Sequence, residues 1–376
     1  MIELINRRSD RFAMHTLTSR ERMLTALDRH VPDRLPVSVH DWMEYFLQTR
    51  LGGMSKIDTF IKFGLDWSIY LPWTVFTQKP DRNWIVEKRE TPIPDETIEI
   101  ETTIVTPEKR FHKLERKDKF KTSWITEYVL KDPEDIFIWS KYFPDGKYDL
   151  ELERRQLEII GDRGILRGCR VGPWHKLCEL YGPEKCINAC FDDPLWVRDA
   201  LAAITEIDLR ALDTMKSTNL DLLETGGGFG SSTVISPSIF REFLLPFEKR
   251  IHAHIREELG IRTVYHTCGG MMPILDLLVE IGSTALETLT PPTMGGDVDL
   301  AELKKRVGDK VALIGGFDQN GGFQNCTPEQ TRKLVRHCFE TAGENGGYIL
   351  NPSDHFFDAD LNNLSAYADE ARKCVY

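Results

Sequence analysis

The chain has 376 residues, of which 41% are hydrophobic, and its net charge is −11. This length exceeds a typical domain, although barrels often run this long as one unit. No apolar run reaches the roughly 18 to 20 residues that span a bilayer, and an acidic chain argues against broad nucleic-acid binding. The eight cysteines are spread along the chain without a disulfide pattern, which predicts free thiols and a cytoplasmic location.

The N-terminal part predicts a leader, a helix and a buried strand. Residues 1–17 are charged and have no apolar core, so we expect a variable leader and not a secretory signal. Thr18 or Ser19 is the expected cap of the helix that follows. The apolar run 35–39 predicts the first strand, which ends at His40.

A different pattern follows between residues 67 and 130. Segments such as 97–104 and 123–129 alternate polar residues with apolar or β-branched ones, and this period is typical of half-exposed strands. We therefore expect an antiparallel β excursion here, inserted into one domain that covers residues 18–376.

The rest of the chain alternates short apolar runs with helical patterns. Strands that alternate with helices imply a parallel sheet with crossover helices. Their number favours an α/β fold of the (β/α)8, or TIM-type, barrel class over an open sheet. No dinucleotide-binding or phosphate-loop motif is present. The predicted strands are 164–168, 220–224, 262–265, 285–289, 311–316 and 347–351.

Polar side chains stand where these predicted strands end. In a (β/α)8 barrel the active site lies at the C-terminal ends of the strands, so position along the chain selects candidate site residues. They are His40, Asp41, Arg167, Glu224, His266, Cys268, Glu287, Asp318, Asp354 and His355.

Within this set, His266 and Cys268 have the spacing of a metal-binding pair. Residues i and i+2 of a strand point to the same side, and imidazole nitrogen and thiolate sulfur are both good zinc ligands. Glu224 ends an apolar strand, and a carboxylate there needs a cation or a hydrogen-bond donor. The pair supplies only two of the three or four protein ligands that zinc needs, so other strand ends must provide the rest.

With these features, the sequence resembles those of the uroporphyrinogen decarboxylase superfamily. The matching segments run in family order over nearly the whole chain, and together they are specific for the superfamily. They are Arg20-Glu21-Arg22, Pro32-Asp33-Arg34-Leu35-Pro36-Val37, Asp132-Pro133-Glu134-Asp135, Ile235-Ser236-Pro237, Phe240-Arg241-Glu242-Phe243, Pro246, His266-Thr267-Cys268-Gly269, Leu303-Lys304, Gly308-Asp309-Lys310-Val311, Gly315-Gly316-Phe317-Asp318, Gly347-Tyr348-Ile349-Leu350 and Asp354-His355 through Asn362.

The resemblance is greater to the zinc- and corrinoid-linked methyltransferase branch than to the decarboxylases. Decarboxylases carry an arginine-rich segment after the first strand to hold the substrate carboxylates, and this chain has none after His40. The methyltransferase branch has a His-x-Cys pair, matched by His266 and Cys268, and a later cysteine. No cysteine stands near residues 352–354. The resemblance therefore leaves the third ligand open among Asp354, His355 and Glu224, since zinc also accepts carboxylate and imidazole.

This branch implies a methyltransferase that moves a methyl group from a small donor, such as an aryl methyl ether or a methylamine, to a corrinoid (cobalamin) protein. Alternatively, the enzyme would move the methyl group from the corrinoid protein to a thiol. Zinc would act as Lewis acid in either reaction. The expected catalytic residues are Asp41, Glu224 and His355. The expected substrate contacts are His40, Trp42, Tyr45, Arg167, Phe317 and Asp318, with Trp42, Tyr45, Trp67, Trp73 and Phe317 as candidate walls of an apolar pocket.

Two other functions remain open from the sequence. One is a decarboxylase without metal, in which Asp41 handles the proton. The other is a non-catalytic barrel that binds a corrinoid or another tetrapyrrole.

Overall fold

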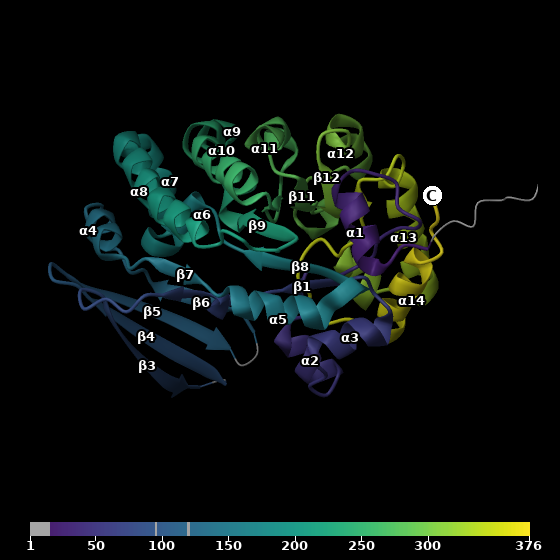
Figure 1. The fold of residues 1–376 in the computed structure, drawn as a ribbon, viewed down its shortest axis with the longest axis horizontal. Helices are drawn as coiled ribbons and strands as arrows, with labels where there is room; N and C mark the ends of the chain where they lie inside the picture. The colour runs from purple at the N-terminus through teal and green to yellow at the C-terminus, as the bar shows by residue number, and fades with distance from the viewer. Residues whose placement is uncertain (1–15, 95, 119–120) are drawn as a thin grey trace, which may run out of the picture.

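A seven-stranded parallel sheet forms the centre of the molecule, whose computed structural model describes residues 16–94, 96–118 and 121–376. Neighbouring strands follow the order of the chain, and the sheet curls into a barrel (Figure 1). Most of the predicted leader 1–17 lies outside the described residues. The strands are β1 Trp67–Tyr70, β8 Gly164–Cys169, β9 Leu222–Gly226, β10 Arg262–His266, β11 Ala285–Thr288, β12 Ala312–Gly315 and β13 Tyr348–Ile349.

The segment 35–39 fills the gap between the two edges of this sheet. Val37 forms a parallel bridge with Leu350, just past β13, and accepts a hydrogen bond of 2.8 Å from the backbone of Asp66, just before β1. The carboxylate of Asp66 takes the place of a backbone carbonyl for the Val37 amide, at 3.0 Å, so the ladder here is short. The predicted (β/α)8 fold class is confirmed, with the first strand reduced to an isolated bridge.

Inside the barrel the side chains form an apolar layer below a polar one. The apolar layer contains Ile165, Leu222, Val264 and Ala285. Strand period places the residue two positions later on the same face. The polar layer therefore consists of Arg167, Glu224, His266 and Glu287, all buried.

Helix α1, Ser19–Leu27, closes the apolar end of the barrel. Met23, Ala26 and Leu27 pack in one cluster with the apolar layer and are at most 2% exposed. Thr18 caps the helix in a capping box with Glu21. The polar layer thus lies at the opposite, C-terminal end of the strands.

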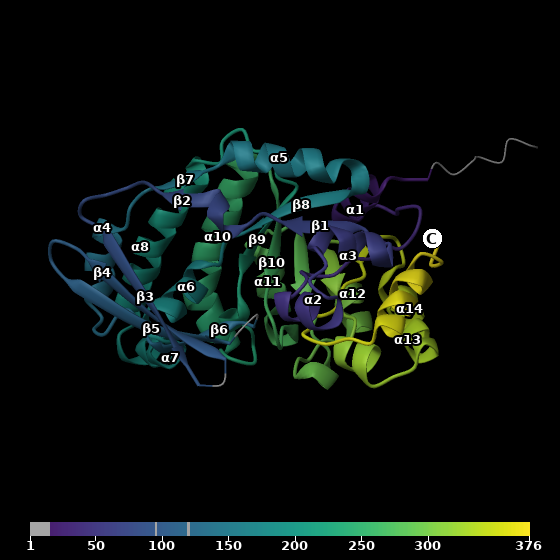
Figure 2. The ribbon, with the colours of Figure 1, turned by 90° about the horizontal axis from the view of Figure 1, so that it is seen from below.

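Helices surround the sheet in the order expected for a barrel (Figures 1 and 2). Helix α10 contacts both α8 and α11, and α13 contacts α12 and α14. Among the residues that the structure describes, none of the helices is long and apolar enough to cross a membrane. The remaining helices are α2 Glu44–Arg50, α3 Lys56–Phe63, α4 Asp135–Tyr142, α5 Leu150–Ile160, α6 Pro173–Tyr181, α7 Pro183–Asp192, α8 Pro194–Asp213, α9 Pro237–Ile239, α10 Leu245–His254, α11 Leu275–Ile281, α12 Leu300–Val307, α13 Pro328–Ala342 and α14 Leu361–Ala371.

The antiparallel excursion is a four-stranded sheet that projects from one side of the barrel (Figures 1 and 2). Its start differs from the prediction of residue 67, because residues 67–70 pair in parallel with β8 and belong to the barrel. At the base of the projecting sheet, Trp84 and Trp139 pack edge to face. The sheet consists of β3 Ile85–Ile93, β4 Thr97–Val105, β5 Arg110–Asp118 and β6 Ser123–Glu127, and a separate pair joins β2 Phe76–Gln78 to β7 Gly146–Tyr148.

Candidate active site

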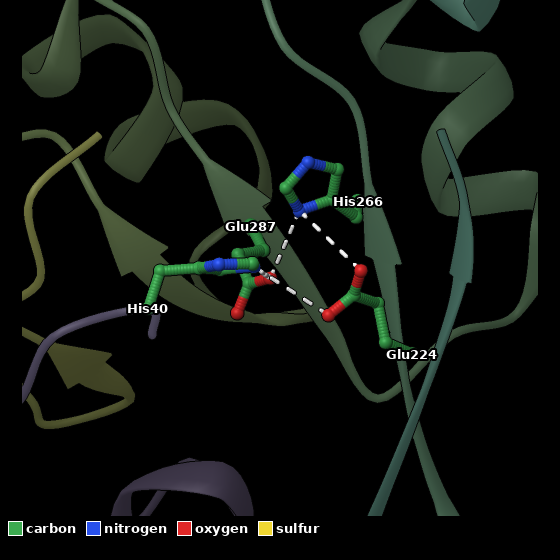
Figure 3. Close-up of side chains that lie close together, drawn as sticks. All are labelled: His40, Glu224, His266 and Glu287. Carbon is green, nitrogen blue, oxygen red and sulfur yellow. Dashed lines mark hydrogen bonds and ion pairs between the residues drawn. The ribbon is translucent and has the colours of Figure 1, made fainter. Parts of the chain in front are cut away.

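Charged side chains from four neighbouring strands meet inside the C-terminal end of the barrel, and His40 joins them. Figure 3 shows His40 with Glu224, His266 and Glu287. Arg167 donates to both carboxylates, at 2.8 Å to Glu224 Oε2 and 2.8 Å to Glu287 Oε2. His266 Nδ1 lies 3.0 Å and His40 Nε2 2.9 Å from Glu287 Oε1. All five side chains are buried, so each charge depends on the others for compensation.

The electrostatics of this cluster keep its carboxylates ionised and its imidazoles protonated. Burial by itself lowers the pKa of His266, but Glu224 and Glu287 raise it to about 9. His40 has a pKa of about 9 for the same opposing causes, burial against the two carboxylates. Burial raises the pKa of Glu224, whereas His266 and His40 lower it to about 2. The cluster is therefore a network of ion pairs in which three cationic side chains share two carboxylates.

A set of three potential metal ligands begins at the other nitrogen of His266. Its Nε2 lies 3.1 Å from Cys268 Sγ, and ligand atoms of His266, Cys268 and Asp354 all lie within 4.8 Å of one another. Zinc bonds of about 2.0–2.3 Å put tetrahedral donors about 3.5 Å apart, so one nitrogen, one sulfur and one oxygen here fit this ion. The Glu287 carboxylate holds Nδ1, so a metal would replace the proton on Nε2, which gives the usual arrangement of a metal-binding histidine.

The chemistry of these donors also suits a cation. Although burial raises the pKa of Asp354, its hydrogen bond with His355 and the charge on His266 hold the pKa well below its usual range. Burial and the Asp354 carboxylate raise the pKa of the Cys268 thiol. A bound cation would supply the positive charge that converts this thiol to the thiolate ligand.

A second group of possible ligands is made by His40, Glu224, His266 and Glu287. Arg167 already lies between these carboxylates, 2.8–2.9 Å from their oxygens. A divalent ion there would meet the guanidinium charge at close range. The set of His266, Cys268 and Asp354 is therefore the better candidate. Glu224 pairs with Arg167, and its role as a ligand stays a prediction.

A cavity of about 430 Å³ opens beside the charged cluster. One wall is apolar and the floor is polar, which is typical of a small-molecule site. The apolar residues are Leu71, Pro72, Trp73, Val75 and Phe76, and the polar ones are His40, Asp41, Lys56, Tyr70, Cys169, Glu224 and His355.

Tyr70 and Cys169 line this cavity but were not predicted. The Tyr70 hydroxyl donates to Glu224 and lies 3.0 Å from His40 Nε2, and the Cys169 thiol lies 3.5 Å from Glu224 Oε1. Both residues end barrel strands, β1 and β8. The position of Tyr70 could have been found only by assigning 67–70 to the barrel.

His355 connects the cavity to the predicted ligand Asp354. Its Nδ1 lies 3.0 Å from Asp354 Oδ1, and its Nε2 lies 3.1 Å from His40 Nδ1. The chain Asp354–His355–His40–Tyr70 can therefore hold and relay a proton along the cavity floor.

Several residues expected to contact the substrate have other contacts. Trp42 is 1% exposed and packs on Phe46, and Phe317 is 0% exposed and packs on Tyr367. Both belong to the core, and neither lines the cavity. Arg167, also expected to bind substrate, is 1% exposed, and both of its terminal nitrogens are bound by the carboxylates of the cluster.

The other predicted residues lie nearer the surface. Asp41 lines the cavity but forms an ion pair of 2.6 Å with Lys56. Tyr45 packs against Phe357, outside the cavity. Asp318 accepts a hydrogen bond from the Gly321 amide at 2.8 Å and lines a separate surface cleft.

Comparison with known proteins gives the family of the chain. The sequence model of the family described as uroporphyrinogen decarboxylase (URO-D) matches residues 116–374. The chain belongs to this family. Its match covers β8 to β13 and all the site residues from Arg167 onward.

Individual relatives and a solved structure match this chain at low sequence identity. Uroporphyrinogen decarboxylase from Thioalkalivibrio sulfidiphilus is 27% identical over 188 residues, 49% of this chain and 50% of that protein. The Neisseria gonorrhoeae enzyme is 29% identical over 164 residues, 41% and 42% of the two chains. The chain thus spans about half the length of these curated relatives. A methyltransferase from Methanosarcina mazei has a TM-score of 0.65 at 15% identity, over 95% of this chain and 99% of that one, which shows the shared fold.

Proposed function

We propose that this protein is a methyltransferase that moves a methyl group from a small methylated donor to a corrinoid protein, or from that protein to a thiol. The observation that carries the proposal is the convergence of His266, Cys268 and Asp354 at the C-terminal end of the barrel. Glu287 orients the imidazole and the cavity lies alongside. The fold shared with a methyltransferase is consistent with this function.

His266 Nε2, Cys268 Sγ and Asp354 would hold zinc, which supplies Lewis acidity to activate a thiol or to polarise the heteroatom that loses its methyl group. Glu287 and Arg167 keep the His266 ring in position. The apolar wall excludes water and takes up the body of the donor.

On the cavity floor, His355 and His40 would hold the proton that the demethylated heteroatom needs. Their ring nitrogens lie 3.1 Å apart, and Tyr70 extends the chain to the cavity. Glu224 would act by orienting Tyr70 and His40. Asp41, which is paired with Lys56, would contact the methyl donor without taking part in catalysis.

The alternative of a metal-free decarboxylase fits this cavity less well. A substrate with several carboxylates needs free cations. Among the described residues that line the cavity, Lys56 is the one with a permanent positive charge. Its charge is neutralised by Asp41.

Methyl transfer to cob(I)alamin tests the proposal. Purified zinc-loaded protein would be mixed with methyl ethers, methylamines or methyl thioethers, and methylcobalamin formation would be followed by absorbance. We expect turnover with one donor class, lost in His266→Ala and retained in His254→Ala, a partly exposed histidine outside the site. A wild-type protein that binds the corrinoid but transfers no methyl group would support the non-catalytic barrel. Decarboxylation without metal would support the decarboxylase.

A further inference from the structure

A second, smaller chamber adjoins the active-site cavity. We call it the distal chamber; its volume is about 200 Å³. Trp73, Phe76 and Cys169 line both spaces, so the two adjoin at these residues. The other residues that line the distal chamber are Trp139, Phe143, Arg170, Val171, Lys176, Ile204, Ile207 and Asp208.

The walls of the distal chamber are aromatic and apolar. The rings of Trp139 and Phe143 have their centres 4.4 Å apart, and the Arg170 guanidinium lies 4.8 Å from the centre of the Phe76 ring. Flat, apolar walls of this kind suit a planar ring. The chamber thus offers room and contacts for the part of a ligand that extends beyond the active-site cavity.

The distal chamber contains two cationic side chains, Arg170 and Lys176, and one carboxylate, Asp208. Arg170 pairs with Asp208 through one Nη, while its Nε is buried and has no hydrogen-bond partner among the described residues. Lys176 Nζ lies 3.3 Å from Glu179, and Glu179 also contacts His175 at 3.7 Å. Lys176 can therefore turn to a ligand while Glu179 keeps a partner.

In the active-site cavity the cations already have carboxylate partners. Glu224 and Asp41 line the active-site cavity, and Lys56 is already paired with Asp41. His40 is likewise held by Glu287 and Glu224. An anionic group of a ligand would therefore find its donors at Lys176 and the Arg170 Nε. The two chambers thus define one orientation for an elongated anionic ligand.

We propose that the distal chamber binds the carboxylate end of the methyl donor, and that the donor is a methylated aromatic acid. The statement that the ligand is a methyl donor rests on the proposed function. The ring lies between Trp73 and Phe76, the carboxylate faces Lys176 and Arg170, and the methylated heteroatom faces the cavity floor. Lys176 is then a specificity-determining residue.

The test is direct binding, measured by calorimetry on metal-free protein without a corrinoid. The ligands are 4-methoxybenzoate and its uncharged analogue 4-methoxybenzyl alcohol. We expect the wild type to bind the acid about tenfold more tightly, the gain of one charge-assisted hydrogen bond, and Lys176→Met to abolish this preference. Lys249→Met, which removes an exposed lysine on α10, is the matched control and should keep it.

A second variant tests the location. Ile204→Trp, which fills the distal chamber, should weaken binding of both ligands while its thermal melting shows a folded protein. Equal binding of acid and alcohol by the wild type, no binding of either, or an undiminished preference in Lys176→Met would overturn the inference. Carboxylate-selective binding without methyl transfer would instead contradict only the proposed function.

Discussion

The Nδ1 atom of His266 lies 3.0 Å from Oε1 of Glu287, and this contact fixes which nitrogen of the ring faces the candidate metal ligands. Nε2 is consequently directed to Cys268 Sγ, 3.1 Å away. Glu287 is itself held by Arg167. A buried ion-pair network therefore orients the metal site.

Replacing Glu287 by Gln should weaken zinc binding. The amide keeps the shape of the side chain but holds the imidazole less strongly, and loss of such a partner typically costs about 10- to 100-fold in metal affinity. Competition with a chromophoric chelator measures this change. Glu280→Gln, at an exposed position on α11, is the control, and equal affinity in the two variants would contradict the role of Glu287.

Asp354 can be tested by substitution with Ala and with Cys. Asp354→Ala should lose zinc, because two ligands remain, whereas Asp354→Cys should retain it, since thiolate is a good zinc ligand. Cobalt substitution gives the readout. Asp354→Cys should increase the sulfur-to-cobalt charge-transfer absorption over that of the wild type. Tight zinc binding by Asp354→Ala would exclude Asp354 as a ligand.

Removal of the Arg167 charge should destabilise the fold. Arg167→Met leaves the buried carboxylates of Glu224 and Glu287 without their main partner, and breaking a buried pair in this way costs about 3–5 kcal/mol. Urea unfolding at pH 7 measures the loss. Arg167→Lys retains the charge and should lose less, and a loss below about 1 kcal/mol in Arg167→Met would contradict the account of the network.

Glu248 should make stability depend on pH. It is 1% exposed, and burial, with a smaller effect of Asp208, raises its pKa from 4.5 to about 8. The folded state thus binds this proton more tightly than the unfolded state. The associated stability is complete below about pH 4.5 and falls, by up to about 5 kcal/mol, as the pH rises to about 8.

Glu248→Gln should remove this dependence. Urea unfolding at pH 5 and pH 8.5 should show similar stability for variant and wild type at the lower pH, and a more stable variant at the higher one. Glu242→Gln, on an exposed carboxylate of the same region, should behave as the wild type does. A wild type with the same pH dependence as Glu248→Gln would contradict the raised pKa.

Much of the barrel and part of the site could be predicted from the sequence. The short apolar runs that lead to Arg167, Glu224, His266 and Glu287 have the length of buried strands, and strand ends are where a barrel places its site. The strand at residues 67–70 was missed because four residues carry little pattern and the antiparallel excursion follows soon after. The partners of Arg167 come from other strands, so only the folded barrel could show that its guanidinium is already paired with two carboxylates.

The aromatic residues were the weakest part of the prediction. Trp42 and Phe317 have the composition of a pocket wall, yet they pack into the core, because an apolar ring gains as much from helix packing as from a ligand. Trp73 lies on the cavity wall as expected. The sequence does not distinguish a ring in the core from a ring on a pocket wall, because in both cases an apolar ring follows a strand.

The coordination of zinc bound to the purified protein tests the central claim most directly. X-ray absorption at the zinc edge should show one equivalent of zinc with one sulfur ligand and the remaining ligands nitrogen or oxygen. The sulfur contribution should disappear in Cys268→Ser and persist in Cys326→Ser. A wild-type protein that binds no zinc, or binds it without sulfur, would contradict the site of His266, Cys268 and Asp354 and the methyl-transfer function built on it.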